Sequence, residues 1–365
     1  MKILLIGEYS NVHATLAAGL KALGHEATVL SNGDFWKDYP RDIDLVRKPG
    51  HWGGLTYMAR LAALLPRLRG YDIVQLINPL FLELKAERMG SIYDYLRRHN
   101  KKMVMGAFGM DWYWVNCCVN DKLLRYSDFN IGDRLRDDAE AMLYRREWTG
   151  TAKETLNKKI AADCDAIVAG LYEYWVSYHP TFPEKTTFIP YPIKMPDTAP
   201  IQWRQGEKVK VFIGINRERS AYKGTDIMLR AAQEVQRRHP DKMELRIAES
   251  VPYAQYCEMM DGIDMILDQL YSYTPSMNPL LAMSKGIVCV GGGEPENYEI
   301  LGEQTLRPIV NVLPNEASVT AQIEAIVLHP EQLPGLQRDS AAYVRKHHDY
   351  MKVAAAYERL YRVLL

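Results

Sequence analysis

The sequence has few cysteines, no excess of charge of either sign and no long apolar run. Its five cysteines include the adjacent pair Cys117 and Cys118 but no C-x-x-C spacing. They therefore form neither a zinc pattern nor a disulfide framework, which suits a reducing cytoplasm. The 45 basic residues balance 45 acidic ones, so we do not expect a protein that coats nucleic acid.

Two further absences concern membranes and targeting. No stretch of the chain is apolar over the length that crosses a bilayer. The first residues, MKILLIGEYS, carry one lysine and an apolar run that is too short for a signal peptide. We interpret this run as a buried first strand and expect a cytoplasmic protein.

The composition that remains is that of a globular protein, and short apolar runs alternate with helix-like segments along it. The chain has 365 residues, of which 47% are hydrophobic, and this length favours two domains. The apolar runs are typical of strands that are covered on both faces. In the first half they are ILLIG (3–7), EATVL (26–30), DIVQLI (72–77), KMVMGAF (102–108) and DAIVAG (165–170). This alternation predicts a parallel sheet flanked by helices.

The pattern pauses between Phe188 and Lys208, where four prolines fall between Pro190 and Pro200. Such a segment cannot continue a sheet or a helix, so we interpret it as a linker. Strand-like runs then resume at VKVFIGI (209–215), MELRIAE (243–249), DMILDQL (264–270) and GIVCV (286–290). We predict an α/β protein with two doubly wound, Rossmann-like domains, residues 1–195 and 205–344, that face a cleft. A C-terminal helix within 345–365 is expected to cross back to the first domain.

In such sheets ligands bind outside the carboxyl ends of the strands, so we expect the site residues in the loops that follow the strands. The first turn, GEYSNVHATLAAGL, lacks the G-x-G-x-x-G of dinucleotide-binding proteins. Gly7 ends the strand, Ser10 or Asn11 can cap the next helix, and His13 could reach a ligand. The turn is either an anion-binding helix start near a donor or acceptor or a plain capped turn.

Three loops of the second half share a chemistry. NRERSAYKG (216–224) places Arg217, Lys223 and Gly224 between a strand and a helix, where cations beside helix-start amides suit a diphosphate. The alternative is a solvated basic loop. YTPSMNPLLAMSKG (273–286) places Ser276 at a helix start, so that the amides of Met277 and Asn278 would face a phosphate.

The third loop, GGGEPENYE (291–299), adds the carboxylates Glu294, Glu296 and Glu299 to a glycine turn. Positive donors at two loops and acids at a third match a ligand with a diphosphate and many hydroxyls. A nucleotide-sugar fits this description, with neither a metal nor a cofactor expected. The acidic loop could equally be solvated.

At these motifs the second half resembles the retaining nucleotide-sugar glycosyltransferases of family 4, which have the GT-B fold. NRERSAYKG is similar to the family's Arg…Lys-Gly loop, LAMSKG and GGEPE to its helix and Gly-Gly-x-Pro-Glu turn, and TTFIPYPI to the end of its first domain. The family also has two glutamates, eight positions apart, which meet the sugar and the ribose. Tyr273 and Leu281 stand at those positions here. The resemblance then implies a donor held through Glu296, Glu299 or Asn278, or an inactive member.

The loop GAFGMDWYWVN (106–116) follows a strand of the first half. The family often has a histidine or an acid after a glycine in this loop. The resemblance therefore implies that Asp111 orients or deprotonates the acceptor hydroxyl. Trp112 and Trp114 suit stacking on a sugar, and the alternative is a core aromatic cluster.

A basic amphipathic segment, residues 51–72, could lie on the inner face of a membrane, although such a helix more often packs on the sheet with its arginines in water. The predicted function is transfer of a sugar from a nucleotide diphosphate to a glycan or lipid-linked glycan, with retention, in surface polysaccharide or glycoconjugate synthesis. Two alternatives remain: a sugar-nucleotide epimerase of similar fold and an inactive sugar-nucleotide-binding subunit.

Overall fold

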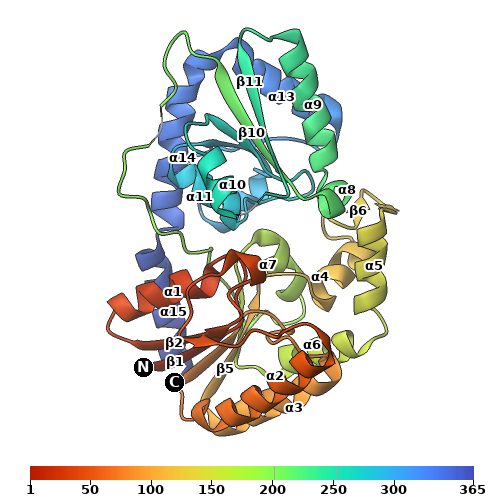
Figure 1. Ribbon diagram of the computed structural model, residues 1–365, viewed down its shortest axis with the longest axis vertical. Coiled ribbons are helices and arrows are strands. Elements are labelled where there is room, and N and C mark those ends of the chain that lie inside the picture. The colour runs from red at the N-terminus through yellow and green to blue at the C-terminus, as the bar shows by residue number, and fades with distance from the viewer. Residues whose placement is uncertain (201, 252) are drawn as a thin grey trace.

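The protein is described by a computed structural model of residues 1–200, 202–251 and 253–365. Ile201, which falls within the expected linker, lies outside the described residues. Two parallel sheets form two units, one from each half of the chain (Figure 1). This arrangement confirms the predicted pair of doubly wound, Rossmann-like domains, whereas the residue bounds that we gave those domains stay a prediction.

The first sheet has seven strands in the order β3-β2-β1-β4-β5-β8-β9, and every neighbouring pair is parallel. Its strands are β1 (Lys2–Ile6), β2 (Glu26–Ser31), β3 (Ile43–Asp44), β4 (Ile73–Leu76), β5 (Lys102–Ala107), β8 (Ala166–Ala169) and β9 (Thr186–Phe188). Leu4 at its centre lies opposite Thr28 on one side and Val74 on the other. Leu4 is fully buried, as the uniformly apolar strand sequence requires.

The crossovers of this sheet run in both directions from β1, and the right-handed connections that are the rule in parallel sheets then place helices on both faces. The helices of the first half are α1 (Val12–Ala22), α2 (Gly50–Leu64), α3 (Ala86–His99), α4 (Trp112–Asn116), α5 (Ala139–Trp148), α6 (Ala152–Asp163) and α7 (Tyr172–Tyr178). Helix α1 lies on one face, and α2, α3 and α6 lie on the other (Figure 1). A small antiparallel hairpin, β6 (Asn130–Ile131) and β7 (Arg134–Leu135), projects toward the second unit (Figure 1).

The second sheet has five parallel strands in the order β11-β10-β12-β13-β14. They are β10 (Val209–Ile215), β11 (Met243–Glu249), β12 (Met265–Leu267), β13 (Val288–Gly291) and β14 (Val310–Asn311). The helices are α8 (Ser220–Lys223), α9 (Thr225–Arg238), α10 (Tyr253–Met259), α11 (Met277–Ser284), α12 (Pro295–Ile300), α13 (Glu316–Leu328), α14 (Leu333–His347) and α15 (Tyr350–Leu364). Helices α9 and α13 pack together on one face, and α11 and α14 on the other (Figure 1).

Helix α15 leaves the second unit and packs on α1 of the first, as predicted (Figure 1). A Cβ atom added at Gly19 would lie 2.6 Å from the Cβ of Ala354, so glycine permits the close approach of the two helices. The hydroxyl of Tyr361 donates a hydrogen bond of 2.7 Å to Gln75 Oε1 in β4. The two units are therefore joined twice, once by the linker and once by the turn between α14 and α15.

The expected amphipathic segment forms α2, which packs on the sheet through a few buried residues such as Tyr57 and Leu61. It leaves Trp52 78% and Leu55 50% exposed. Among the described residues, none of the helices combines the length and the apolar composition that crossing a bilayer requires. Contact between α2 and a membrane surface stays a prediction.

Candidate nucleotide-diphosphate site

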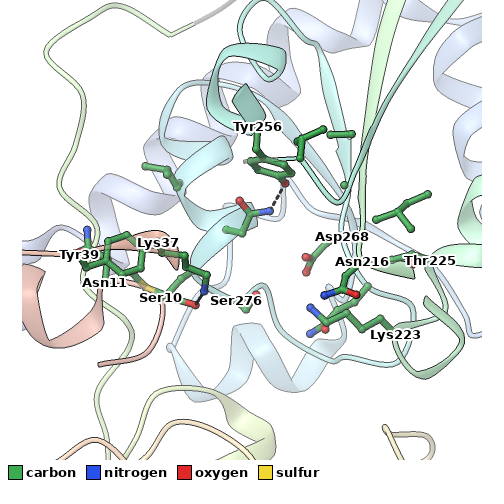
Figure 2. A pocket seen from close by; sticks show the side chains of 18 of the residues that line it. Ser10, Asn11, Lys37, Tyr39, Asn216, Lys223, Thr225, Tyr256, Asp268 and Ser276 are labelled. Carbon is green, nitrogen blue, oxygen red and sulfur yellow. Dashed lines mark hydrogen bonds between the residues drawn. The ribbon is translucent and has the colours of Figure 1, made fainter. Parts of the chain in front are cut away.

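A cavity of about 360 Å³ lies between the two units, at the carboxyl ends of β10 and β12. This is the edge at which ligands bind in open α/β sheets. The second unit contributes the N-terminus of α11 and the loops after β10, β11 and β12, and the first unit contributes the turn before α1 and the loop after β2. Among the polar residues that line it are Ser10, Asn11, Lys37, Tyr39, Asn216, Lys223, Thr225, Tyr256, Asp268 and Ser276 (Figure 2).

Lys223 is the predicted diphosphate ligand that the structure places in the cavity. It ends α8 because Gly224 follows in the left-handed conformation, with φ at 72°. A Cβ atom at Gly224 would lie 2.5 Å from the Cβ of Leu270, so packing also requires glycine there. Burial lowers the pKa of Lys223, and the nearby Arg219 lowers it further. An anionic ligand would restore the charged form of this lysine.

Arg217, the second cation expected at the diphosphate, lies outside the cavity lining. Its guanidinium pairs with Glu249 at the end of β11, with Nη2 donating to Oε2 over 3.1 Å. The side chain is 76% exposed. Arg217 is therefore a solvated surface residue in this structure, which is the alternative that we gave for this loop. Lys223 from the same loop faces the cavity.

The N-terminus of α11 faces the cavity as expected. Ser276 is at its N-cap position without a side-chain hydrogen bond to the helix, and Ser276, Met277 and Asn278 all line the cavity. Asn278 Nδ2 donates 2.7 Å to the hydroxyl of Tyr256. Leu281 also lines the cavity, one helical turn further along. An apolar side chain thus stands where the family resemblance led us to look for a ribose-binding carboxylate.

Asp268 is a cavity residue that sequence reasoning missed. We predicted a strand through Leu270, but β12 ends at Leu267, which moves Asp268 into the loop and its carboxylate into the cavity (Figure 2). Burial raises the pKa of this carboxyl to about 7, although Lys223 acts in the opposite direction. An acid directly after an apolar run was the signal available in the sequence.

Of the residues predicted for a site in the first turn, some line the cavity and others lie in the core. Ser10 and its neighbour Asn11 line the cavity, whereas Gly7 and His13 lie outside its lining. His13 is fully buried, with Nδ1 2.8 Å from the Gly7 carbonyl oxygen, and burial lowers its pKa to about 3. His13 is therefore a neutral core residue. The helix is capped by Glu8, which accepts hydrogen bonds from the amides of His13 and Ala14, and not by the side chain of Ser10 or Asn11 as expected.

Tyr273, Glu294 and Glu296 join the two units instead of lining the cavity. They surround Arg125, and we call these four residues the Arg125 clamp. The Arg125 amide donates 2.7 Å to the Tyr273 hydroxyl, and its guanidinium lies 4.8 Å from the centre of that ring. Nη2 donates 2.7 Å to Glu294, and Nη1 pairs with Glu296. Glu299 lies exposed on α12, outside the cavity lining.

Glu173, a buried acid of the first unit, positions the loop that precedes α11. Glu173 in α7 accepts from the amides of Tyr273 and Thr274 over 2.7 and 3.0 Å, and from the Thr274 hydroxyl over 2.5 Å. Burial raises the pKa of Glu173, and the Thr274 hydroxyl opposes that shift. The first unit thereby sets the direction in which the α11 amides point.

Asp111, the expected catalytic residue, is fully buried and lies outside the cavity lining. It caps α4 by accepting 2.9 Å from the Trp114 amide, and it accepts 2.6 Å from the Tyr178 hydroxyl. Burial raises its pKa to about 7. These contacts give Asp111 a structural role, and Trp114 is buried in an aromatic cluster, as the alternative interpretation had it. Trp112 is half-buried, with Lys158 Nζ 3.9 Å from its ring centre.

Within residues 1–200, 202–251 and 253–365, no group of three or more His, Cys, Asp or Glu side chains is arranged to hold a metal. The expectation of a metal-free site stays a prediction.

Two parallel-sheet units with a cavity between their carboxyl edges define the GT-B class of fold, and known structures share it along the whole chain. The sucrose-phosphate synthase of Thermosynechococcus elongatus matches with a TM-score of 0.62 at 12% identity, over 100% of this chain and 99% of that one. Anabaena HepE in complex with UDP-glucose matches with a TM-score of 0.62 at 12% identity, over 99% of each chain.

WaaG, a glycosyltransferase involved in lipopolysaccharide biosynthesis, matches with a TM-score of 0.53 at 10% identity, over 100% of this chain and 99% of that chain. No protein-family model matches the sequence, and neither does any curated protein. At these identities the likeness to solved structures shows the fold.

Proposed function

We propose that the protein is a glycosyltransferase that takes a sugar from a nucleotide-diphosphate donor. The observation that carries this proposal is the cavity at the carboxyl edge of the second sheet, where Lys223 and the amide end of α11 meet. A cation and free helix-start amides together suit a diphosphate. Support comes from HepE, a structure of the same fold that holds UDP-glucose. The second unit would bind the donor, and the first unit the acceptor.

We further propose the acceptor class, the stereochemistry and the location. A glycan or lipid-linked acceptor is consistent with the lipopolysaccharide pathway of WaaG, and retention follows from the family resemblance. We also propose a cytoplasmic location at the inner face of a membrane, which the exposed Trp52 and Leu55 of α2 support. Flotation with anionic vesicles tests this location, because a protein that stays at the bottom of the gradient does not bind the surface.

Lys223→Ala tests the donor site. Loss of a hydrogen bond from a charged group should weaken UDP binding by about 1.5–3 kcal/mol, which is roughly 10- to 150-fold in Kd. Calorimetric titration of UDP, GDP and ADP measures it. The control is Arg217→Ala from the same loop, which removes an equal charge outside the cavity lining. Equal losses in both variants would mean that charge alone, and not the cavity, holds the nucleotide.

A catalytically inactive nucleotide-binding subunit is the second candidate. It is favoured by Leu281, which brings no carboxylate to the cavity, and by the burial of Asp111. Incubation with UDP-sugars and extracted glycans or glycolipids separates the two, since transfer of label to the acceptor requires an active enzyme. Binding of UDP with no transfer to any acceptor would favour the inactive subunit.

A further inference from the structure

The cavity contains a carboxylate that no contact within the protein fully accounts for. Asp268 directs its carboxylate into the ligand space (Figure 2). Its Oδ2 atom is shielded from solvent and, within the part of the chain that the structure describes, receives no hydrogen bond. A buried polar atom without a partner is costly. Such an atom at the wall of a cavity is best explained by a donor group on the ligand.

The charges around Asp268 restrict what that donor group can be. Among the described residues that line the cavity, the charged ones are Lys37, Lys194, Lys223 and Asp268. The lysines suit an anion, and a carboxylate would repel that anion. Lys223 attracts this carboxylate, and the acid suits a ligand that presents hydrogen-bond donors beside its phosphates.

We infer that Asp268 accepts hydrogen bonds from a pair of adjacent hydroxyl groups that flank the diphosphate of the donor. A carboxylate has two oxygens that accept and none that donates, which matches two neighbouring hydroxyl donors. The pair belongs either to the ribose or to the sugar that is transferred, one on each side of the diphosphate. Leu281 leaves the cavity without a carboxylate on α11, and Asp268 supplies one from the end of β12. This inference rests on the proposed function.

The test is calorimetric titration of the wild type and Asp268→Asn with UDP, 2′-deoxy-UDP and UDP-glucose at pH 8. Asparagine keeps the shape of the side chain and removes the charge. Charge alone would make the variant bind every polyanion more tightly, because a repulsive group has been removed. Loss of the hydrogen bonds to the hydroxyls would weaken binding instead. The sign of the change in affinity therefore shows whether Asp268 accepts from the ligand.

If the ribose is the source, UDP binding by Asp268→Asn should weaken about tenfold. The wild type should also prefer UDP to 2′-deoxy-UDP, and the variant should lose that preference. If the sugar is the source, UDP should bind the variant at least as tightly as the wild type, while UDP-glucose weakens about tenfold. Tighter binding of all three ligands by the variant would overturn the inference.

The control is Asp261→Asn, which removes the same charge from an exposed residue that pairs at 3.5 Å with Lys285. Its Kd values should equal those of the wild type, and melting curves show that both variants are folded. A wild type that binds neither these three ligands nor the GDP and ADP of the donor-site test refutes the proposed function together with the inference. A wild type that binds UDP, with a variant that only gains affinity, refutes the inference alone.

Discussion

At the scale of single residues, Gly224 fixes the position of Lys223. Its φ of 72° is unfavourable for other residues, and a Cβ there would also collide with Leu270. Gly224→Ala should therefore lower the free energy of unfolding by about 2–4 kcal/mol, from backbone strain and overpacking together. Urea unfolding measures the loss.

Gly262 provides the matched control, because its φ is 71° and a Cβ there would meet no atom within 4 Å. Gly262→Ala carries the backbone strain alone, so it should cost about 1–2 kcal/mol. A Gly224→Ala variant no less stable than Gly262→Ala would show that the contact with Leu270 relaxes freely.

Asp268 should also make stability depend on pH. Burial raises its pKa to about 7 in the folded protein, whereas the unfolded chain ionises near pH 3.9. The folded state therefore binds the proton more tightly, and the cost of ionisation grows from about pH 4 to pH 7 and is complete above that. Asp268→Asn removes this cost, so the variant should melt a few °C above the wild type at pH 8.

At pH 4.5 most of that advantage should be absent, because the wild-type carboxyl is then largely protonated in the folded state. Melting curves at the two pH values, without ligand, measure the difference. A gap of the same size at both values would mean that Asp268 does not titrate between them.

At the scale of elements, the long buried strands follow from apolar runs, but their order in the sheets and their ends do not. DMILDQL is apolar enough to predict a strand to Leu270, yet β12 ends at Leu267. The three lost residues include the carboxylate that reaches the cavity. The contacts of the two acids in GGGEPE could not be predicted either, because both pair with Arg125. Arg125 is about 170 positions away and lies in a segment without periodicity.

The Arg125 clamp makes a prediction about the contact between the units. Glu294 is buried and also accepts hydrogen bonds from the Tyr126 hydroxyl over 2.5 Å and from Asn311 Nδ2 over 3.1 Å. Arg125→Ala leaves this carboxylate without its cation, so the free energy of unfolding should fall by about 1–3 kcal/mol. The units should also separate more readily, which small-angle scattering detects as a larger radius of gyration.

Arg134→Ala in the neighbouring hairpin is the control. Its side chain is 85% exposed and approaches Asp137 only at 3.9 Å, so its removal should change stability by less than about 0.5 kcal/mol. If both variants unfold like the wild type, the clamp contributes no more than a surface ion pair.

At the scale of the whole molecule, α15 belongs to the first unit although it follows the second in the chain. Its buried face includes Val353, Ala354, Tyr357 and Tyr361. A chain that stops at His348 exposes the partner face of α1, so it should melt well below the full chain or aggregate. Val363→Asp, at a position 83% exposed on the same helix, should melt like the wild type. Equal melting of the truncated chain would mean that α15 adds nothing to the first unit.

The position of α15 also has a consequence for synthesis on the ribosome. Chains emerge from their N-terminus, and domains generally fold as they appear. All seven strands of the first sheet are made by residue 188, but the helix that covers α1 begins at Tyr350. The apolar face of α1 therefore stays exposed in the nascent first unit while some 160 further residues are translated. This takes roughly 10–30 seconds at ordinary elongation rates. During that interval the unfinished unit is a natural client for a chaperone.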